Sequence, residues 1–163
     1  MEEHDSMLMR RAIALAKTAK EAEGQAPIGC VIVLDGRIIA EGCNEVGPRC
    51  DPTAHAEIVA IGRAAAAVGQ PELRGATLYS TLQPCGMCTM ASIWAKVVRI
   101  VYGATRDQVH HMYFEDRHLG TLDFISDAYR DDMRVDGGVL GEECAELYYR
   151  PGDAVPDEKQ GNQ

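Results

Sequence analysis

The sequence has no long apolar run and no segment with the features of a secretory signal. No stretch reaches the roughly 18 apolar residues of a membrane-spanning helix. The N-terminus from Met1 to Asp5 is acidic and has no apolar core. In such a chain we expect the six cysteines to be reduced thiols rather than a disulfide framework. The expected location is the cytoplasm, with no membrane partner.

Basic side chains are scarce in the last third of the chain. Residues 1–106 contain 11 Lys or Arg and 11 Asp or Glu, whereas residues 107–163 contain 5 and 14. The net charge of -9 therefore arises entirely after residue 106. A surface of this kind repels a polyanion, which makes nucleic acid a poor partner. The simpler interpretation is a solvated acidic face that keeps the protein soluble.

The chain is long enough to form one domain with its own core. It has 163 residues, of which 46% are hydrophobic. We expect a single domain over residues 1–150. Residues 151–163 contain few apolar side chains and are expected to form an acidic, disordered tail.

Helix and strand patterns alternate along this domain. Asp35-Gly36 separates two apolar strands, which is a strong hairpin signal. Helices between strands from residue 52 to 102 imply parallel pairing through crossovers. The sequence therefore predicts an α/β fold, a three-layer α/β/α sandwich around a mixed central sheet. The expected helices are one capped by Asp5 or Ser6, then 52–68, 84–95, 119–129 and 142–149, and the expected strands are 30–34, 37–40, 76–81, 97–102 and 133–135.

Two short motifs together predict a catalytic zinc site. His55 stands two residues before Glu57, and Cys85 and Cys88 follow in Pro-Cys-Gly-Met-Cys. A structural zinc site fills four positions with Cys and His, whereas a catalytic site uses three protein ligands and leaves one for water. We therefore expect one Zn²⁺ per chain on His55, Cys85 and Cys88, with a water as fourth ligand. The unligated Glu57 is expected to move protons.

The prolines before each motif suggest where the ligands lie. Asp51-Pro52-Thr53 and Gln83-Pro84 each look like a helix start, so the ligands are expected in the first turns of two helices. The partial positive charge of a helix N-terminus favours thiolate and hence metal binding. Two other interpretations stay open: a redox or structural Cys-x-x-Cys pair, and a structural site completed by a fourth cysteine. The remaining cysteines are Cys30, Cys43, Cys50 and Cys144.

His-x-Glu followed by Pro-Cys-x-x-Cys is the pattern of zinc nucleobase deaminases. The chain resembles the cytidine deaminase-like superfamily from about Asp5 to Arg150. The matching segments beyond the two ligand motifs are Pro27-Ile28-Gly29, Asn44, Asp51-Pro52-Thr53-Ala54 and Leu78-Tyr79-Ser80-Thr81-Leu82. The resemblance implies the same sandwich fold, a hydrolytic deaminase and a homodimer.

Within the superfamily, the segment from Asn44 to Asp116 is similar to bacterial guanine deaminases. The resemblance implies that Asn44 meets a polar edge of the base, Asp116 accepts from its N–H groups and Trp94 helps to wall the pocket. The activity it implies is hydrolysis of guanine to xanthine and ammonia. The plainer alternatives are a turn residue for Asn44, a core aromatic for Trp94 and a surface acid for Asp116.

Other parts of the chain depart from guanine deaminases. The position before Pro84 is Gln83, where guanine and tRNA adenosine deaminases often have Glu, and the guanine deaminase C-terminal tail is not recognisable in 151–163. Gly137 to Ala145 instead resembles the last helix region of tRNA adenosine deaminases, so adenosine-to-inosine editing of tRNA is an alternative. Cytosine, a nucleoside or another aminated heterocycle are further alternatives, as is a zinc-stabilised binding module without turnover. Arg106–Asp132, with His110, His111 and His118, is left without a role.

Overall fold

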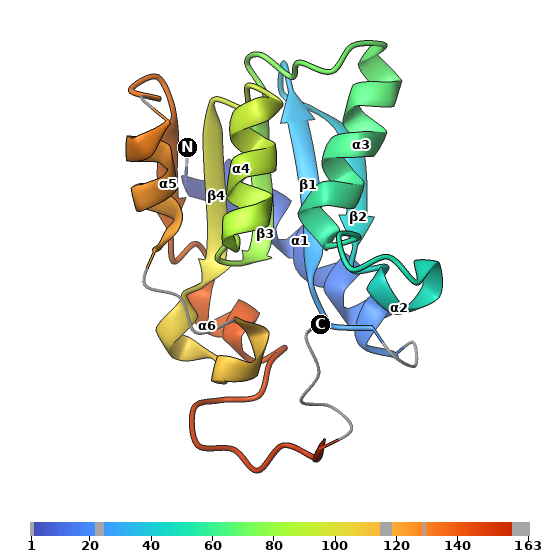
Figure 1. Ribbon diagram of the computed structural model, residues 1–163, viewed down its shortest axis with the longest axis vertical. Coiled ribbons are helices and arrows are strands. Elements are labelled where there is room, and N and C mark those ends of the chain that lie inside the picture. Colours follow the sequence, from blue (N-terminus) through green and yellow to red (C-terminus); the bar gives the residue numbers. More distant parts are fainter. Residues whose placement is uncertain (1, 22–24, 115–118, 129, 158–163) are drawn as a thin grey trace.

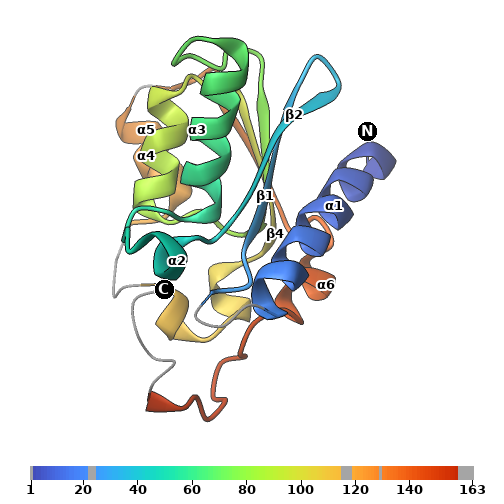
Figure 2. The ribbon, with the colours of Figure 1, turned by 90° about the vertical axis from the view of Figure 1, so that its right-hand side faces the viewer.

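The computed structural model describes residues 2–21, 25–114, 119–128 and 130–157. A five-stranded sheet forms its middle layer, in the order β2-β1-β3-β4-β5 (Figure 1). Helices α3, α4 and α5 lie on one face, and α1 and α6 lie on the other (Figure 2). The predicted three-layer α/β/α sandwich is confirmed. The strands are β1 Gly29–Leu34, β2 Arg37–Cys43, β3 Thr77–Leu82, β4 Arg99–Ala104 and β5 Arg134–Gly137, and the α-helices are α1 Glu2–Glu21, α2 Val46–Arg49, α3 Ala56–Val68, α4 Gly86–Trp94, α5 Thr121–Asp127 and α6 Gly141–Ala145.

The sheet is mixed, as expected. β1 pairs antiparallel with β2 and with β3, whereas β3–β4 and β4–β5 are parallel. The β1–β2 hairpin turns at Asp35 and Gly36, which both have positive φ, the conformation that tight hairpins require. Helix α4 connects β3 to the parallel strand β4, as the predicted crossover required.

The core lies on both faces of the sheet. Helix α1 buries an alanine-rich stripe that includes Ala12, Ala16 and Ala19, whereas Leu15 is only partly buried. Small side chains let this helix approach β1 closely. A Cβ atom on Gly29 would lie 2.1 Å from the carbonyl oxygen of Ala12. None of the helices in the described parts of the chain combines the length and apolar character needed to cross a bilayer.

Two helices begin later than the prolines suggested. Helix α3 starts at Ala56 rather than Pro52, and α4 starts at Gly86 rather than Pro84. In the first case the Asp51 carboxylate accepts hydrogen bonds from the backbone N–H and the hydroxyl of Thr53, which holds this segment in a turn. The helix expected over 142–149 is also shorter, because α6 ends at Ala145.

The C-terminal segment is described as far as residue 157. Residues 151–157 contain no α-helix or strand, and Val155 is 9% exposed. The domain boundary at residue 150 and the disorder of the tail stay predictions.

Candidate active site

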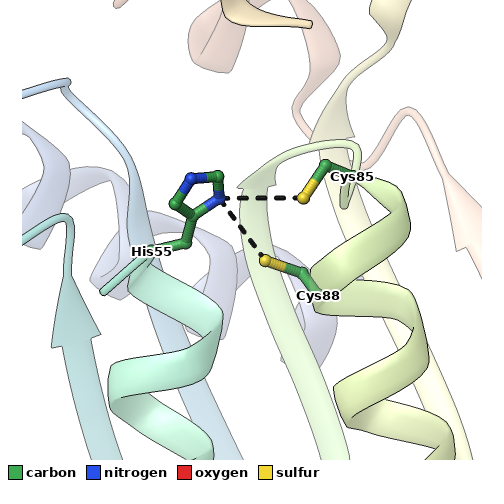
Figure 3. Close-up of side chains that lie close together, drawn as sticks. All are labelled: His55, Cys85 and Cys88. Atoms are coloured by element: carbon green, nitrogen blue, oxygen red, sulfur yellow. Dashed lines mark hydrogen bonds between the residues drawn. The ribbon is translucent and has the colours of Figure 1, made fainter. Parts of the chain in front are cut away.

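The candidate metal ligands lie where two helices begin on the same face of the sheet. His55 is the N-cap residue of α3, and Cys85 is the N-cap residue of α4. Both have extended backbone conformations, and Cys88 follows in the first turn of α4. Figure 3 shows the imidazole Nδ1 turned towards both sulfur atoms. The late helix starts therefore place two ligands at cap positions rather than inside a helix.

Close packing against β2 fixes where α3 begins. Gly42 on β2 faces the first turn of α3, and a Cβ atom there would lie 2.6 Å from the carbonyl oxygen of Ala56. Only glycine allows this approach without a shift of the helix. The position of His55 depends on this contact, because His55 directly precedes Ala56.

The three ligand atoms have the spacing that zinc requires. The Nδ1 atom of His55 is 3.7 Å from Cys85 Sγ and 3.6 Å from Cys88 Sγ. Zinc bonds of about 2.3 Å to sulfur and about 2.0 Å to nitrogen, at a tetrahedral angle, separate such ligand atoms by about 3.6 Å. All three atoms lie within 4.8 Å of one another. The donor set therefore fits zinc, and within the described residues it leaves one tetrahedral position without a protein ligand.

The two thiols differ in acidity. A hydrogen bond from Cys88, followed by one from His55, lowers the pKa of Cys85 to about 4 despite its burial. The same interaction with Cys85, together with burial, raises the pKa of Cys88 well above its usual value. Cys85 therefore loses its proton to form a thiolate more readily than Cys88 does. Each of the six cysteines is free, and the other four lie outside the ligand group.

Glu57 lies beside this group but does not belong to it. Its side chain is 3% exposed, with Oε2 3.4 Å from Cys88 Sγ and Oε1 3.0 Å from the hydroxyl of Ser80. Burial is the largest cause that raises the pKa of Glu57, and the negative charge of Cys85 adds to it. A raised pKa makes this carboxyl group a better proton acceptor than an ordinary glutamate, and it can return the proton that it takes.

Of the three substrate contacts implied by the resemblance, the structure describes Asn44 and Trp94. Asn44 is 1% exposed, and its Oδ1 atom accepts from the backbone N–H of Val46. Its Nδ2 atom has no hydrogen-bond partner among the described residues. Trp94 is 75% exposed at the end of α4, so it is not a core aromatic. Asp116 and His118 lie outside the described residues.

A cavity of about 250 Å³ opens directly onto the ligands. Its wall includes residues that the sequence did not single out as substrate contacts, notably Arg106 and Phe114. The Arg106 guanidinium lies 5.2 Å from the centre of the Phe114 ring. The only signal in the sequence was that Phe114 directly precedes the Glu-Asp pair of the guanine deaminase-like segment. Neither Trp94 nor Asn44 is in the wall, which is formed by Pro52, Thr53, His55, Gln83, Pro84, Cys85, Gly86, Met87, Arg106, Tyr113, Phe114, Leu119 and Gly120.

Comparison with known proteins agrees with this site. The tRNA-specific adenosine deaminase of Haemophilus influenzae is 39% identical over 147 residues, which span 88% of this chain and 80% of the relative. The guanine deaminase of Bacillus subtilis is 41% identical over 116 residues, or 71% of this chain and 74% of the relative. A solved tRNA:A34 deaminase superposes with a TM-score of 0.74 at 37% identity, and the match covers 86% of this chain and 98% of that one.

These relatives confirm the resemblance to the deaminase superfamily. They also weaken the expectation that nucleic acid is a poor partner, because two of the three act on tRNA. The cytidine and deoxycytidylate deaminase zinc-binding region matches residues 2–104, which include every candidate metal ligand and Glu57. The ligand geometry and this match together make the chain a member of the zinc-binding cytidine and deoxycytidylate deaminase family, whose members are hydrolytic enzymes.

Proposed function

We propose that the protein hydrolyses the exocyclic amine of a free nucleobase, with guanine converted to xanthine and ammonia. The observation that carries this proposal is the buried Glu57 carboxyl group next to the cluster of His55, Cys85 and Cys88. Two members of this cluster, His55 and Cys85, line a small cavity. A binding module without turnover has no need of an unligated, buried carboxyl group at this place. In this proposal Glu57 is the catalytic residue and the other three hold the metal.

The reaction exchanges an amino group for an oxygen atom. When zinc is bound, it supplies the Lewis acidity that makes hydroxide available near neutral pH. Glu57 accepts a proton from the attacking water as a C–O bond forms at the ring carbon that bears the amine. Glu57 gives this proton to the ring nitrogen. It then takes the second proton from the new hydroxyl group and gives it to the amine, the C–N bond breaks, and ammonia leaves.

The dimensions of the cavity favour a base over a larger substrate. Its volume of about 250 Å³ is below the roughly 300–1,000 Å³ of sites for drug-sized ligands. Asn44 is not in the cavity wall, but it keeps a buried amide donor without a partner among the described residues, and its contact with the base stays part of this proposal. Guanine presents acceptors that such a donor can meet. The roles of Trp94 and Asp116 stay part of this proposal.

Editing of tRNA adenosine is the second candidate. It is favoured by the named activities of relatives that align over most of the chain. The surface charge favours the first candidate, because Glu142, Glu143 and Glu146 on and after α6 are all exposed. The phosphate backbone of tRNA would be repelled by such a surface. This α6 segment is the part that resembles tRNA adenosine deaminases.

A homodimer and a cytoplasmic location also stay proposals. Exposed apolar side chains on neighbouring helices support the dimer, since Trp94 on α4 and Leu122 on α5 are 75% and 68% exposed. An exposed Trp94 can only help to wall a pocket if another surface covers it. Sedimentation analysis of the purified protein tests the dimer. The six free cysteines support a reducing compartment.

Ammonia release by the zinc-loaded protein tests the proposed reaction. The panel contains guanine, guanosine, adenine, adenosine, cytosine and cytidine, together with a tRNA anticodon stem–loop that carries adenosine at the wobble position. Turnover of guanine in preference to the others supports the free-base proposal. Turnover of the stem–loop alone replaces it with tRNA editing.

A further inference from the structure

Ser80 is a fully buried polar residue in contact with the proposed catalytic carboxyl group. It lies in β3, opposite Cys30 of β1, and its side chain is 0% exposed. Its hydroxyl donates a 3.0 Å hydrogen bond to Oε1 of Glu57 on α3. This bond joins the middle strand of the sheet to the first turn of the helix that follows His55.

The two carboxylate oxygens of Glu57 have different surroundings. Oε1 accepts from Ser80, on the side of the sheet, whereas Oε2 lies 3.4 Å from Cys88 Sγ, on the side of the metal ligands. A carboxyl group free to rotate about its last torsion would turn away from this arrangement, because that torsion is broad. The hydrogen bond from Ser80 opposes this rotation.

Building on the proposed role of Glu57, we infer that Ser80 is a positioning residue that keeps Oε2 of Glu57 facing the metal ligands. Oε2 is then the atom that takes the proton from water and returns it to the substrate, while Oε1 keeps its bond to the Ser80 hydroxyl throughout. The O–H bond of Ser80 is not broken, so the proton balance of the reaction is unchanged. Ser80 itself does not touch the substrate.

Strand alternation provides a matched control beside Ser80. Neighbouring side chains of a strand point to opposite faces. The Thr81 hydroxyl contacts the Tyr148 hydroxyl at 2.7 Å and accepts from the backbone N–H of Gly29, away from Glu57. Thr81 is as fully buried as Ser80. Loss of the Thr81 hydroxyl should therefore lower stability without altering the orientation of Glu57.

The test compares Ser80→Ala, Ser80→Thr, Ser80→Val and the control Thr81→Val, each at equal zinc content. Threonine and valine have nearly the same shape, so this pair isolates the hydroxyl from the volume of the side chain. On the substrate identified by the panel, we expect Ser80→Ala and Ser80→Val to lose about 10- to 100-fold in kcat, the value of one hydrogen bond to a charged group. KM should stay within about twofold. Ser80→Thr should recover most of kcat, and Thr81→Val should change the melting temperature but not kcat.

A crystal structure of the zinc-loaded Ser80→Ala protein supplies a readout that needs no substrate. We expect the Glu57 carboxyl group to be rotated or spread over two orientations, with the metal ligands unmoved. An unmoved carboxyl group, or an equal loss of kcat in the threonine and valine variants, would overturn the positioning role. If no compound of the panel is turned over, the proposed function fails, and the orientation of Glu57 in the crystal still decides the role of Ser80.

Discussion

Gly42 of β2 packs directly against the backbone of Ala56, at the start of the helix that follows His55. A Cβ atom at Gly42 would lie 2.6 Å from the Ala56 carbonyl oxygen and 2.9 Å from the backbone nitrogen of Ala60. Both atoms belong to the backbone of α3, so the helix cannot yield by rotating a side chain. The metal ligand at the start of α3 is therefore held in place by the absence of a side chain on β2.

Substitution Gly42→Ala should displace α3 and disturb the zinc site. We expect the free energy of unfolding to fall by about 1–3 kcal/mol, the usual cost of overpacking. Zinc affinity should fall by about tenfold, as for other changes that reorient a ligand. Chelator competition and thermal melting measure the two effects. Gly62→Ala, in the same helix, is the control. A Cβ atom at Gly62 would meet nothing within 4 Å, so this substitution should stabilise the protein slightly.

Removal of either thiolate should abolish zinc binding. Cys85→Ala and Cys88→Ala leave two protein ligands, and elemental analysis of the purified variants should find much less than one zinc ion per chain. Cys43→Ala should retain the metal, since Cys43 lies outside the ligand group. Full zinc content in Cys85→Ala would show that the ligand set is wrong.

Substitution Glu57→Gln should separate metal binding from catalysis. Glutamine keeps the shape of the side chain and can accept from Ser80, but it cannot carry the proton. We expect normal zinc content and a loss in kcat on the order of 10³-fold, within the range for general acid–base groups. Substantial residual turnover would discard the proposed role of Glu57.

The partly buried ion pair between Asp5 and Arg99 should make stability depend on pH. Both Arg99 terminal nitrogens donate to the Asp5 carboxylate at 2.9 Å, and these bonds are the largest cause that lowers the pKa of Asp5. A depressed pKa in the folded state means that the stabilisation is complete above the unfolded value of about 3.9. It is lost as the pH falls from there through the folded pKa.

We therefore expect Asp5→Asn to cost on the order of 3 kcal/mol at pH 7, as in other buried pairs that lose one partner. The difference from the wild type should shrink below about pH 4. Denaturant unfolding at pH 7 and pH 3 measures this. Glu72→Gln, which removes a surface pair with Arg74, should change stability by less than about 0.5 kcal/mol at either pH. A pH-independent cost of Asp5→Asn would contradict the assignment.

The fold and the metal ligands were predictable because their signals are local. Apolar runs on both sides of Asp35-Gly36 specify the hairpin. The two cysteines of one Cys-x-x-Cys share a helix face by spacing alone. The predicted helix starts were too early because proline is as common in turns as in the first turn of a helix. Pro52 lies in the turn that the Asp51 carboxylate stabilises. Spacing also indicates nothing about contacts between distant strands and helices.

Ser80 illustrates this limit. Its partner Glu57 is 23 residues away and becomes a neighbour only after α3 has packed on β3. The exposure of Trp94 is a second contact property that the sequence does not indicate. An aromatic residue at the end of an apolar helix is typical of a core position, yet Trp94 is exposed. Asn44 was singled out by resemblance, but its unpartnered amide is visible only in the folded chain.

The cavity joins two parts of the chain that differ in what they contribute. The candidate metal ligands and Glu57 all precede residue 104, whereas a part of the cavity wall follows it, including Arg106, Tyr113, Phe114 and Leu119. Mutations in the second segment can reshape the wall without disturbing the zinc ligands. Substrate preference is therefore free to diverge during evolution while the chemistry stays constant, and a gene of this kind can acquire a new substrate through changes in a single short stretch of its coding sequence.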